Sequence, residues 1–397
     1  MIDPLRRWRY SPVEPRDLRL DLLRGYCVFL IAINHLATFP AWTVYITGGG
    51  RLWVSGAEGF VLISGLVLGA LYRRRSVERG WAWSIAHVLR RSAALYLLAV
   101  VGHWLFSTGD YLLRAWRGRV TDLPANYFDT LINVVFHVRY YFEGFDLLPL
   151  YALLLPWGLG AVYLLQRGRW KWVLLISAAI WGAWQIDRGA LVVLRLKFPF
   201  AIWQFLFISG VVAGFYRAEL GRGWRLWPCR RARTLVLIGG ALAILLVSFQ
   251  MTYGGLWSDV EALQTAGPVF TRVTLAPGRI VAAMWVLAGL YALLTLGWAP
   301  VQRLIGWLLL PLGQHALTAY VWQAVIAYVV LRLPNYPFPG HDEFVMTAAH
   351  VMVVLVVWTS VQLTVKARRR LARFRRRRGT GGAAEAVAPG AQDARRH

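Results

Sequence analysis

The sequence predicts an all-α, polytopic transmembrane helix bundle of about ten spans, with both termini in the cytoplasm. Of its 397 residues, 58% are hydrophobic and only 16% are charged, whereas about a quarter of a soluble protein is charged. The apolar residues form runs close to the roughly 20 residues that a helix needs to cross a bilayer. Because the hydrocarbon core offers no water to the backbone, helices are the expected structure of these runs.

Ten apolar runs are predicted to span the membrane. They are residues 20–40, 53–72, 84–106, 145–166, 171–187, 199–216, 233–251, 279–298, 307–331 and 344–366. The stretch 120–143 is amphipathic and too polar to span, so we expect it at the outer interface. The resulting domains are a basic leader (1–19), a transmembrane domain (20–366) and a basic, disordered tail (367–397), with the disorder expected above all from residue 379.

The basic residues predict the orientation. An N-terminus inside places about three quarters of the 44 lysines and arginines on the cytoplasmic side, as the positive-inside rule requires. We therefore expect a multi-pass protein of the cell (inner) membrane. The lipid bilayer is its first partner, and the run Arg375 to Arg378 is expected to bind anionic headgroups.

Composition also excludes several function classes. The net charge of +25 lies in short clusters between apolar runs, and nothing resembles a nucleic-acid-binding module, so no nucleic-acid partner is predicted. Cys27 falls inside the first span and Cys229 in a basic loop, which argues against a disulfide between them. No pair of histidines has metal-ligand spacing with a carboxylate, so no metal site is predicted.

Ionisable residues inside a span are costly and are functional candidates by default. In the first span, Asp21 and Arg24 are three residues apart and can pair on one helix face. Arg24 and His35 are eleven apart, which is three turns plus about 20°, so they share a face about 16 Å apart along the axis. One face therefore carries a cation near the cytoplasm and an imidazole deep in the bilayer.

The second span supplies a carboxylate at a similar depth. Glu58 lies about one turn from its outer end, and a carboxylate beside His35 would fix the imidazole tautomer and raise its basicity, as a general base requires. The alternative is that His35 and Glu58 only hydrogen-bond between two helices. Residue chemistry alone leaves both interpretations open.

These residues carry a family resemblance. The run from Arg16 to Gly25, the Asn34–His35 pair and the run from Ala57 to Gly65 resemble the OpgC family of membrane acyltransferases, within the wider acyltransferase-3 group. Further matching runs are 146–151, 199–204 and 312–315, so the similarity follows nearly the whole chain. Position 34 is usually Asp in the family and is Asn here, which leaves His35 as the base and gives Asn34 a supporting role. Gly59 stands where the family often has a larger apolar residue.

The resemblance implies an O-acyltransferase that moves an acyl group from cytoplasmic acyl-CoA to a hydroxyl of an extracytoplasmic glycan. Succinyl groups, carried by succinyl-CoA, and periplasmic glucans are the family's named case. No cofactor would be bound, since acyl-CoA is a substrate. The implied roles are catalysis by His35 and Glu58, and acyl-CoA binding by Arg24, Asp21 and His315. Acceptor binding or oxyanion stabilisation is assigned to Asn34, Asp146, Trp203 and Gln204.

Two other classes of protein remain open. In a transporter or flippase for a glycan or a lipid-linked intermediate, the same buried charges would line a permeation path, and inverted repeats or broken helices are typical of that class. No internal repeat is evident, and the charges concentrate in the first two spans. In a non-catalytic membrane scaffold, the buried charges would be dispensable.

Overall fold

The computed structural model describes residues 16–36, 40–116, 118, 145–188, 198–226, 230–253, 267–272, 274–333 and 342–385. These residues form helices and connecting turns, with no strand among them, so the predicted all-α class is confirmed. The interfacial stretch expected over 120–143 lies outside the described residues.

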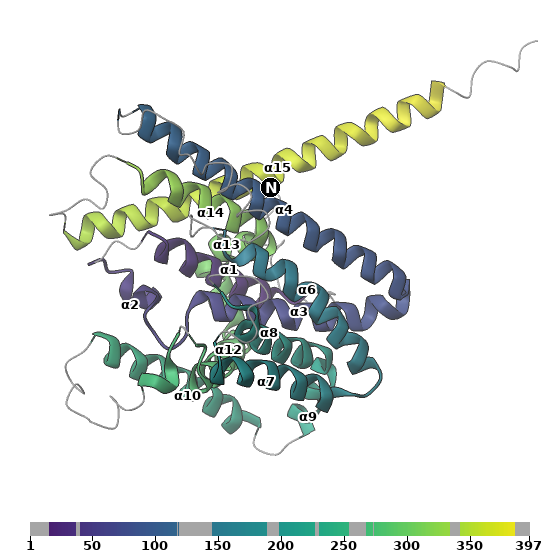
Figure 1. Ribbon diagram of the computed structural model, residues 1–397, viewed down its shortest axis with the longest axis vertical. Coiled ribbons are helices and arrows are strands. Elements are labelled where there is room, and N and C mark those ends of the chain that lie inside the picture. Colours follow the sequence, from purple (N-terminus) through teal and green to yellow (C-terminus); the bar gives the residue numbers. More distant parts are fainter. Residues whose placement is uncertain are drawn as a thin grey trace, which may run out of the picture.

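The helices follow one another in a bundle (Figure 1). The α-helices are α1 (Leu18–Asn34), α2 (Val44–Thr47), α3 (Gly56–Arg79), α4 (Trp81–Trp116), α6 (Leu147–Gln166), α7 (Trp170–Ile186), α8 (Phe200–Phe215), α9 (Arg217–Leu226), α10 (Arg230–Tyr253), α12 (Pro277–Leu296), α13 (Trp298–Gln314), α14 (Ala316–Val330) and α15 (Glu343–Glu385). Two short 3₁₀ helices are η2 (Gly48–Gly50) and η4 (Gly267–Phe270).

Length and composition identify the helices that can cross a membrane. Six of the described helices pass on their own, namely α3, α4, α6, α10, α12 and α15, and eight spans result if each of two bent helix pairs is one span. The expected total of about ten would also need α1 and α7, which have 17 residues each and stand at the lower limit for spanning. The multi-pass class is therefore shown, while the total of ten and the side on which the termini lie stay predictions.

The span predicted over 307–331 is not one straight helix, because the structure bends it at His315. Helices α13 and α14 meet there at an angle of 94°. Pro311 has no amide hydrogen to donate to the carbonyl of Trp307, and that carbonyl instead accepts a hydrogen bond of 3.0 Å from Nε1 of Trp358. Hydropathy does not detect this break, since both halves are apolar.

Two other boundaries differ from the prediction. The connection between the predicted spans 53–72 and 84–106 is the end of α3 and the start of α4, joined at Gly80, whose positive φ reverses the chain. Helix α15 continues to Glu385 and extends beyond the bundle (Figure 1). Helix α15 thus includes the first residues of the tail expected from residue 379, the residues after Glu385 lie outside the described part of the chain, and the disorder of the tail stays a prediction.

Helices α1 and α13 pack backbone against backbone. A Cβ added to Gly25 would lie 1.9 Å from the carbonyl oxygen of Leu309, and one added to Gly313 would lie 1.7 Å from that of Asp21. Small residues at such crossings allow the close approach that membrane helices use for packing. This crossing fixes α1, which carries the candidate site, against the helix that precedes the break.

Helices α3 and α8 make a second crossing of this kind, and it yields a stability prediction. A Cβ on Gly65 would lie 2.1 Å from the carbonyl oxygen of Phe207, and one on Gly214 would lie 1.9 Å from that of Leu66. We expect Gly65→Ala or Gly214→Ala to destabilise the protein by about 1–3 kcal/mol, because the helices must separate. Thermal unfolding of the purified protein in nanodiscs measures the change.

The matched control is Gly239→Ala on α10, where an added Cβ meets nothing within 4 Å. Alanine favours a helix over glycine by about 1 kcal/mol, so this variant should unfold at the wild-type temperature or slightly above it. Equal effects of Gly239→Ala and Gly214→Ala would contradict the close crossing.

Candidate functional site

A cavity inside the bundle is built around Arg24 of α1. It measures about 160 Å³ and lies between α1, α3, α4, α6 and α14. Its polar lining residues are Arg24, Ser64, Tyr72, Arg91, Tyr151 and Tyr320, and the other lining residues are aliphatic or aromatic. Two arginines and four residues with hydroxyl groups line one space, so the cavity is suited to an anionic or oxygen-rich group.

Arg24 has no hydrogen-bonded or ion-paired partner among the described residues. Its Nε is buried without a partner. The phenol of Tyr151 donates to Oγ of Ser64 over 3.1 Å instead. Buried charges in proteins are normally paired, so an unpaired guanidinium beside a cavity indicates a place for an external anion.

The expected pair of Asp21 and Arg24 is not formed. The Asp21 carboxylate receives two hydrogen bonds from Arg16, from Nε at 2.5 Å and from Nη2 at 3.0 Å, and the aspartate is 5% exposed. Arg16 also reaches the carbonyl of Gln314 over 3.3 Å. Asp21 is thus paired with Arg16, two residues before α1, and makes no hydrogen bond or ion pair with Arg24.

His35 caps the C-terminal end of α1, and its partner comes from α14. Its Nδ1 lies 2.9 Å from Oε1 of Gln323, which is 1% exposed. The preceding Asn34 has a buried Oδ1 with no hydrogen-bond partner within the described chain. The side chain of Asn34 lies beside Gly50 of η2.

The expected pair of His35 and Glu58 is not formed either. Glu58 is fully buried at the start of α3, where its Oε2 accepts from the backbone and hydroxyl of Ser55 and its Oε1 binds Nε of Arg279 at 2.6 Å. Arg279, at the start of α12, is 2% exposed and also donates to the carbonyl of Leu52 over 3.1 Å. Glu58 therefore acts as a helix cap and as the partner of a buried cation.

Helix α14 connects the two ends of the candidate site. Tyr320 lines the cavity at Arg24, and Gln323, three residues further along α14, contacts His35. Three residues are about 4.5 Å along a helix axis. The cavity thus reaches to within one turn of the amide that binds the imidazole, although His35 itself does not line it.

The remaining predicted site residues differ in their surroundings. Trp203 is 2% exposed and packs edge-on against Phe198, so its position is that of a core residue. Asp146 is 3% exposed and precedes α6. His315 stands at the α13–α14 break, next to Ala316, which lines the Arg24 cavity.

Gln204 has no capacity left to stabilise an oxyanion. Its Nε2 donates to the carbonyls of Ser177 and Ala201, at 2.8 and 3.1 Å, and its Oε1 accepts from Ser177 at 2.6 Å and from Trp157 at 3.2 Å. An amide has two donor hydrogens and two acceptor lone pairs, and all are used here. Gln204 joins α8 to α6 and α7, and the expected oxyanion role does not fit this geometry.

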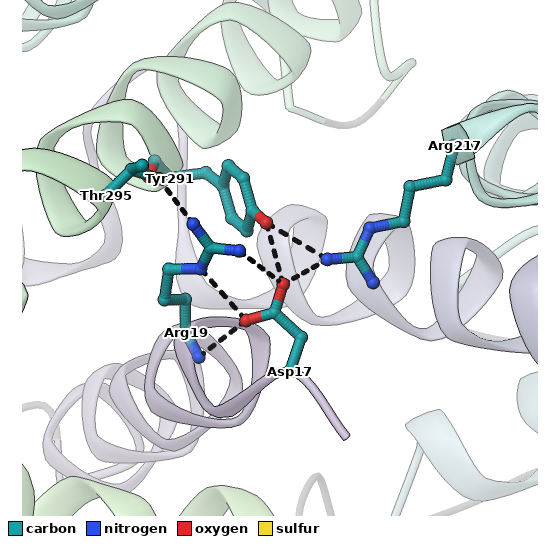
Figure 2. A network of polar contacts seen from close by, with 5 residues as sticks. All are labelled: Asp17, Arg19, Arg217, Tyr291 and Thr295. Atoms are coloured by element: carbon teal, nitrogen blue, oxygen red, sulfur yellow. Dashed lines mark hydrogen bonds and ion pairs between the residues drawn. The ribbon is translucent and has the colours of Figure 1, made fainter. Parts of the chain in front are cut away.

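A polar network holds the first turn of α1 in place (Figure 2). Asp17 accepts two hydrogen bonds of 3.0 Å from the Arg19 side chain and one of 2.7 Å from Tyr291, and it is also bound by Arg217. Arg19 continues to Thr295 over 2.9 Å. Burial would raise the pKa of Asp17, but these hydrogen bonds and the charges of Arg19 and Arg217 outweigh burial and lower the pKa below its ordinary value.

Sequence reasoning missed three residues that the structure places at the site. Gln323 and Tyr320 lie in an apolar run, and only their polar groups distinguish them from the neighbouring residues. Arg279 entered the prediction only as one of the 44 lysines and arginines weighed for orientation, although it follows Pro277 and Gly278 at a helix start and is buried in the bundle. A polar side chain within an apolar run is the one signal that could have found the first two.

The fold and the site define a multi-pass helical membrane protein with two arginines at an internal cavity and a separate buried ion pair. Residues 16–370 match the sequence model of the family described as OpgC protein, so the chain belongs to the OpgC family, which suggests an acyltransferase. No curated protein sequence matches the chain. No solved structure matches it.

Proposed function

We propose that this protein is an inner-membrane O-acyltransferase. It takes an acyl group from cytoplasmic acyl-CoA and transfers it to a hydroxyl of an extracytoplasmic glycan such as a periplasmic glucan, with both of its own termini in the cytoplasm. The single observation that supports this best is the Arg24 guanidinium, which has no partner among the described residues and lies beside a cavity. Helix α14 lines the same cavity and carries Gln323, the partner of His35. Family membership supplies the reaction class.

The cavity favours a negatively charged donor. Arg24 and Arg91 both line it, and no carboxylate does. A guanidinium binds phosphate or carboxylate oxygens through several donors at once, and acyl-CoA carries phosphates. Tyr72, Tyr151 and Tyr320 add hydroxyls that can bind the polar groups of the donor. Succinyl is the acyl group that the family's named case suggests.

The chemistry assigned to His35 is general-base catalysis of a transesterification, in which a sugar hydroxyl attacks the thioester. The imidazole takes the proton of the sugar hydroxyl as its oxygen attacks the thioester carbonyl, which forms the new C–O bond and a tetrahedral oxyanion. Collapse of this intermediate breaks the C–S bond, and the imidazolium returns its proton to the departing thiolate of CoA. The products are the acylated glycan and CoA.

A transporter or flippase remains the second candidate, because two described helix pairs are broken. The bends are 67° between α8 and the start of α9 and 94° between α13 and α14, and broken helices are typical of transporters. The two candidates differ in what they bind. An acyltransferase should form acylated glycan from a thioester and release CoA, whereas a transporter should be indifferent to thioesters.

The test is to incubate the protein in nanodiscs with acetyl-CoA or succinyl-CoA and a periplasmic glucan, and to measure free thiol and the mass of the glucan. Formation of glucan ester with matching CoA release is the expected result. The acyltransferase proposal would be overturned if no glucan ester forms and neither thioester stabilises the protein against thermal unfolding.

Arg24→Gln gives a prediction for the donor site. The variant should fold normally, because Arg24 makes no hydrogen bond or ion pair within the described chain. It should lose most of the acyl-CoA-dependent stabilisation, which for the wild type amounts to about 2.7 kcal/mol at a ligand concentration 100 times Kd. Thermal unfolding with and without acyl-CoA measures both effects.

Arg303→Gln is the matched control, because Arg303 is an exposed arginine of α13 that lines no part of the Arg24 cavity. It should keep the full ligand-dependent shift. An unchanged shift in Arg24→Gln would remove Arg24 from donor binding.

A further inference from the structure

Gln323 is the buried amide that holds the candidate base. It lies on α14 with 1% of its surface exposed, and its Oε1 is 2.9 Å from Nδ1 of His35. The two residues are 288 positions apart in the chain. The contact therefore depends on the packing of α14 against α1, which is observed directly.

The identity of the contacting atoms determines the state of the imidazole. An amide oxygen can only accept a hydrogen bond, so Nδ1 of a neutral His35 must carry the hydrogen. The lone pair that can take a proton is then on Nε2. A base that is oriented by a third group is the usual arrangement around an activated hydroxyl.

The other half of the Gln323 amide argues against a purely structural role. Its Nε2 is buried and has no hydrogen-bond partner within the described chain, which is unfavourable for a polar group. Gln204, also buried, uses all of its hydrogen-bonding groups between helices. A glutamine kept only for packing would be expected to resemble Gln204.

The ionisable groups on the elements around this end of α1 are either bound by other residues or set apart from His35 by exposure or position. Glu58 of α3 is bound by Arg279 of α12, and His350 of α15 by the hydroxyl of Thr43. Arg272, before α12, donates to the carbonyl of Gly50 over 3.4 Å. Arg51, at the end of η2, is exposed to solvent. On α14 and α13 the ionisable groups are Tyr320 and Tyr328, and Arg303 near the start of α13.

We propose that Gln323 is the positioning residue of His35: its amide oxygen fixes the imidazole with the hydrogen on Nδ1, which makes Nε2 the nitrogen that acts as the base. The inference rests on the proposed acyl transfer, because it assigns His35 its partner in that reaction. It replaces Glu58 in the role expected from the sequence.

Two substitutions test the positioning role of Gln323 in the acyl-transfer assay described for the wild type. Gln323→Met removes the acceptor at similar volume and should lower kcat about 10²-fold with little change in KM, since a misplaced base slows the chemical step. Gln323→Glu keeps an acceptor but adds a negative charge beside Nδ1, which stabilises the imidazolium. The acid limb of its pH–kcat profile should move upward by about 1 pH unit or more.

The matched control is Gln302→Glu, which puts a carboxylate at another buried glutamine, on α13. Its pH–kcat profile should coincide with that of the wild type. A Gln323→Glu profile that also coincides with the wild type would overturn the proposal, and so would a Gln323→Met variant with full kcat.

A readout without activity separates this inference from the proposed function. In protein labelled with ¹⁵N-histidine, the difference spectrum between wild type and His35→Ala should show a neutral ring with its hydrogen on Nδ1. The corresponding difference spectrum, taken with and without His35→Ala in the Gln323→Met background, should show the ordinary mixture of rings with the hydrogen on Nδ1 or on Nε2. A ring with its hydrogen on Nε2 in the wild type would overturn the positioning role, whereas absence of glucan acylation with the Nδ1 tautomer present would count against the acyl transfer alone.

Discussion

Replacement of His35 by alanine is expected to lower kcat for acyl transfer about 10²–10⁴-fold, the range that general-base catalysis contributes. The hydroxyl of the acceptor would then have no group to take its proton as it attacks the thioester carbonyl. KM for acyl-CoA should change little, because Arg24, which faces the donor cavity, is unaffected. Release of CoA by protein in nanodiscs, with the glucan in excess, measures both constants.

The control for this prediction is His87→Ala. His87 stacks on Trp83 near the start of α4, with ring centroids 4.8 Å apart, and the sequence assigns it no role. The variant should retain wild-type kcat. Full activity in His35→Ala, with an unfolding temperature equal to that of the wild type, would show that the base has been assigned to the wrong residue.

Apolar runs predicted where the helices lie, but not how each helix ends. Each predicted span coincides with a described helix or helix pair, because burial in hydrocarbon selects apolar composition regardless of partner. Hydropathy averages over a window, so it does not register the break at His315, where Pro311 removes one backbone donor. It also missed that α3 continues to Arg79, since its last turn is charged.

The candidate site was predictable only within one helix. The periodicity of α1 places Arg24 and His35 on one face without reference to any other segment. The partners come from elsewhere in the chain: Gln323 for His35, Arg279 for Glu58 and Arg16 for Asp21. Spacing in a single sequence contains no information about which helices pack together, so Glu58 was paired with the wrong residue.

The buried pair of Glu58 and Arg279 leads to the largest expected effect on stability. Their side chains are 0% and 3% exposed, with 2.6 Å between Oε1 and Nε. Arg279→Met leaves a carboxylate buried without its cation, and we expect a loss of about 3–5 kcal/mol, the range for breaking one side of a buried pair. Thermal unfolding of purified protein in nanodiscs measures it.

The double variant Glu58→Met with Arg279→Met separates the pair from its surroundings. Replacing both partners removes the unpaired charge, so it should recover most of the lost stability. Arg332→Met is the comparison for a more accessible pair, since Arg332 and Asp110 are 24% and 30% exposed, and about 0–1 kcal/mol is expected there. A double variant as unstable as Arg279→Met alone would contradict a simple ion pair.

The double variant also decides between two roles for Glu58. If the carboxylate serves only as the cap of α3 and the partner of Arg279, the recovered protein should keep its kcat, whereas a catalytic Glu58 would leave a stable protein with little activity.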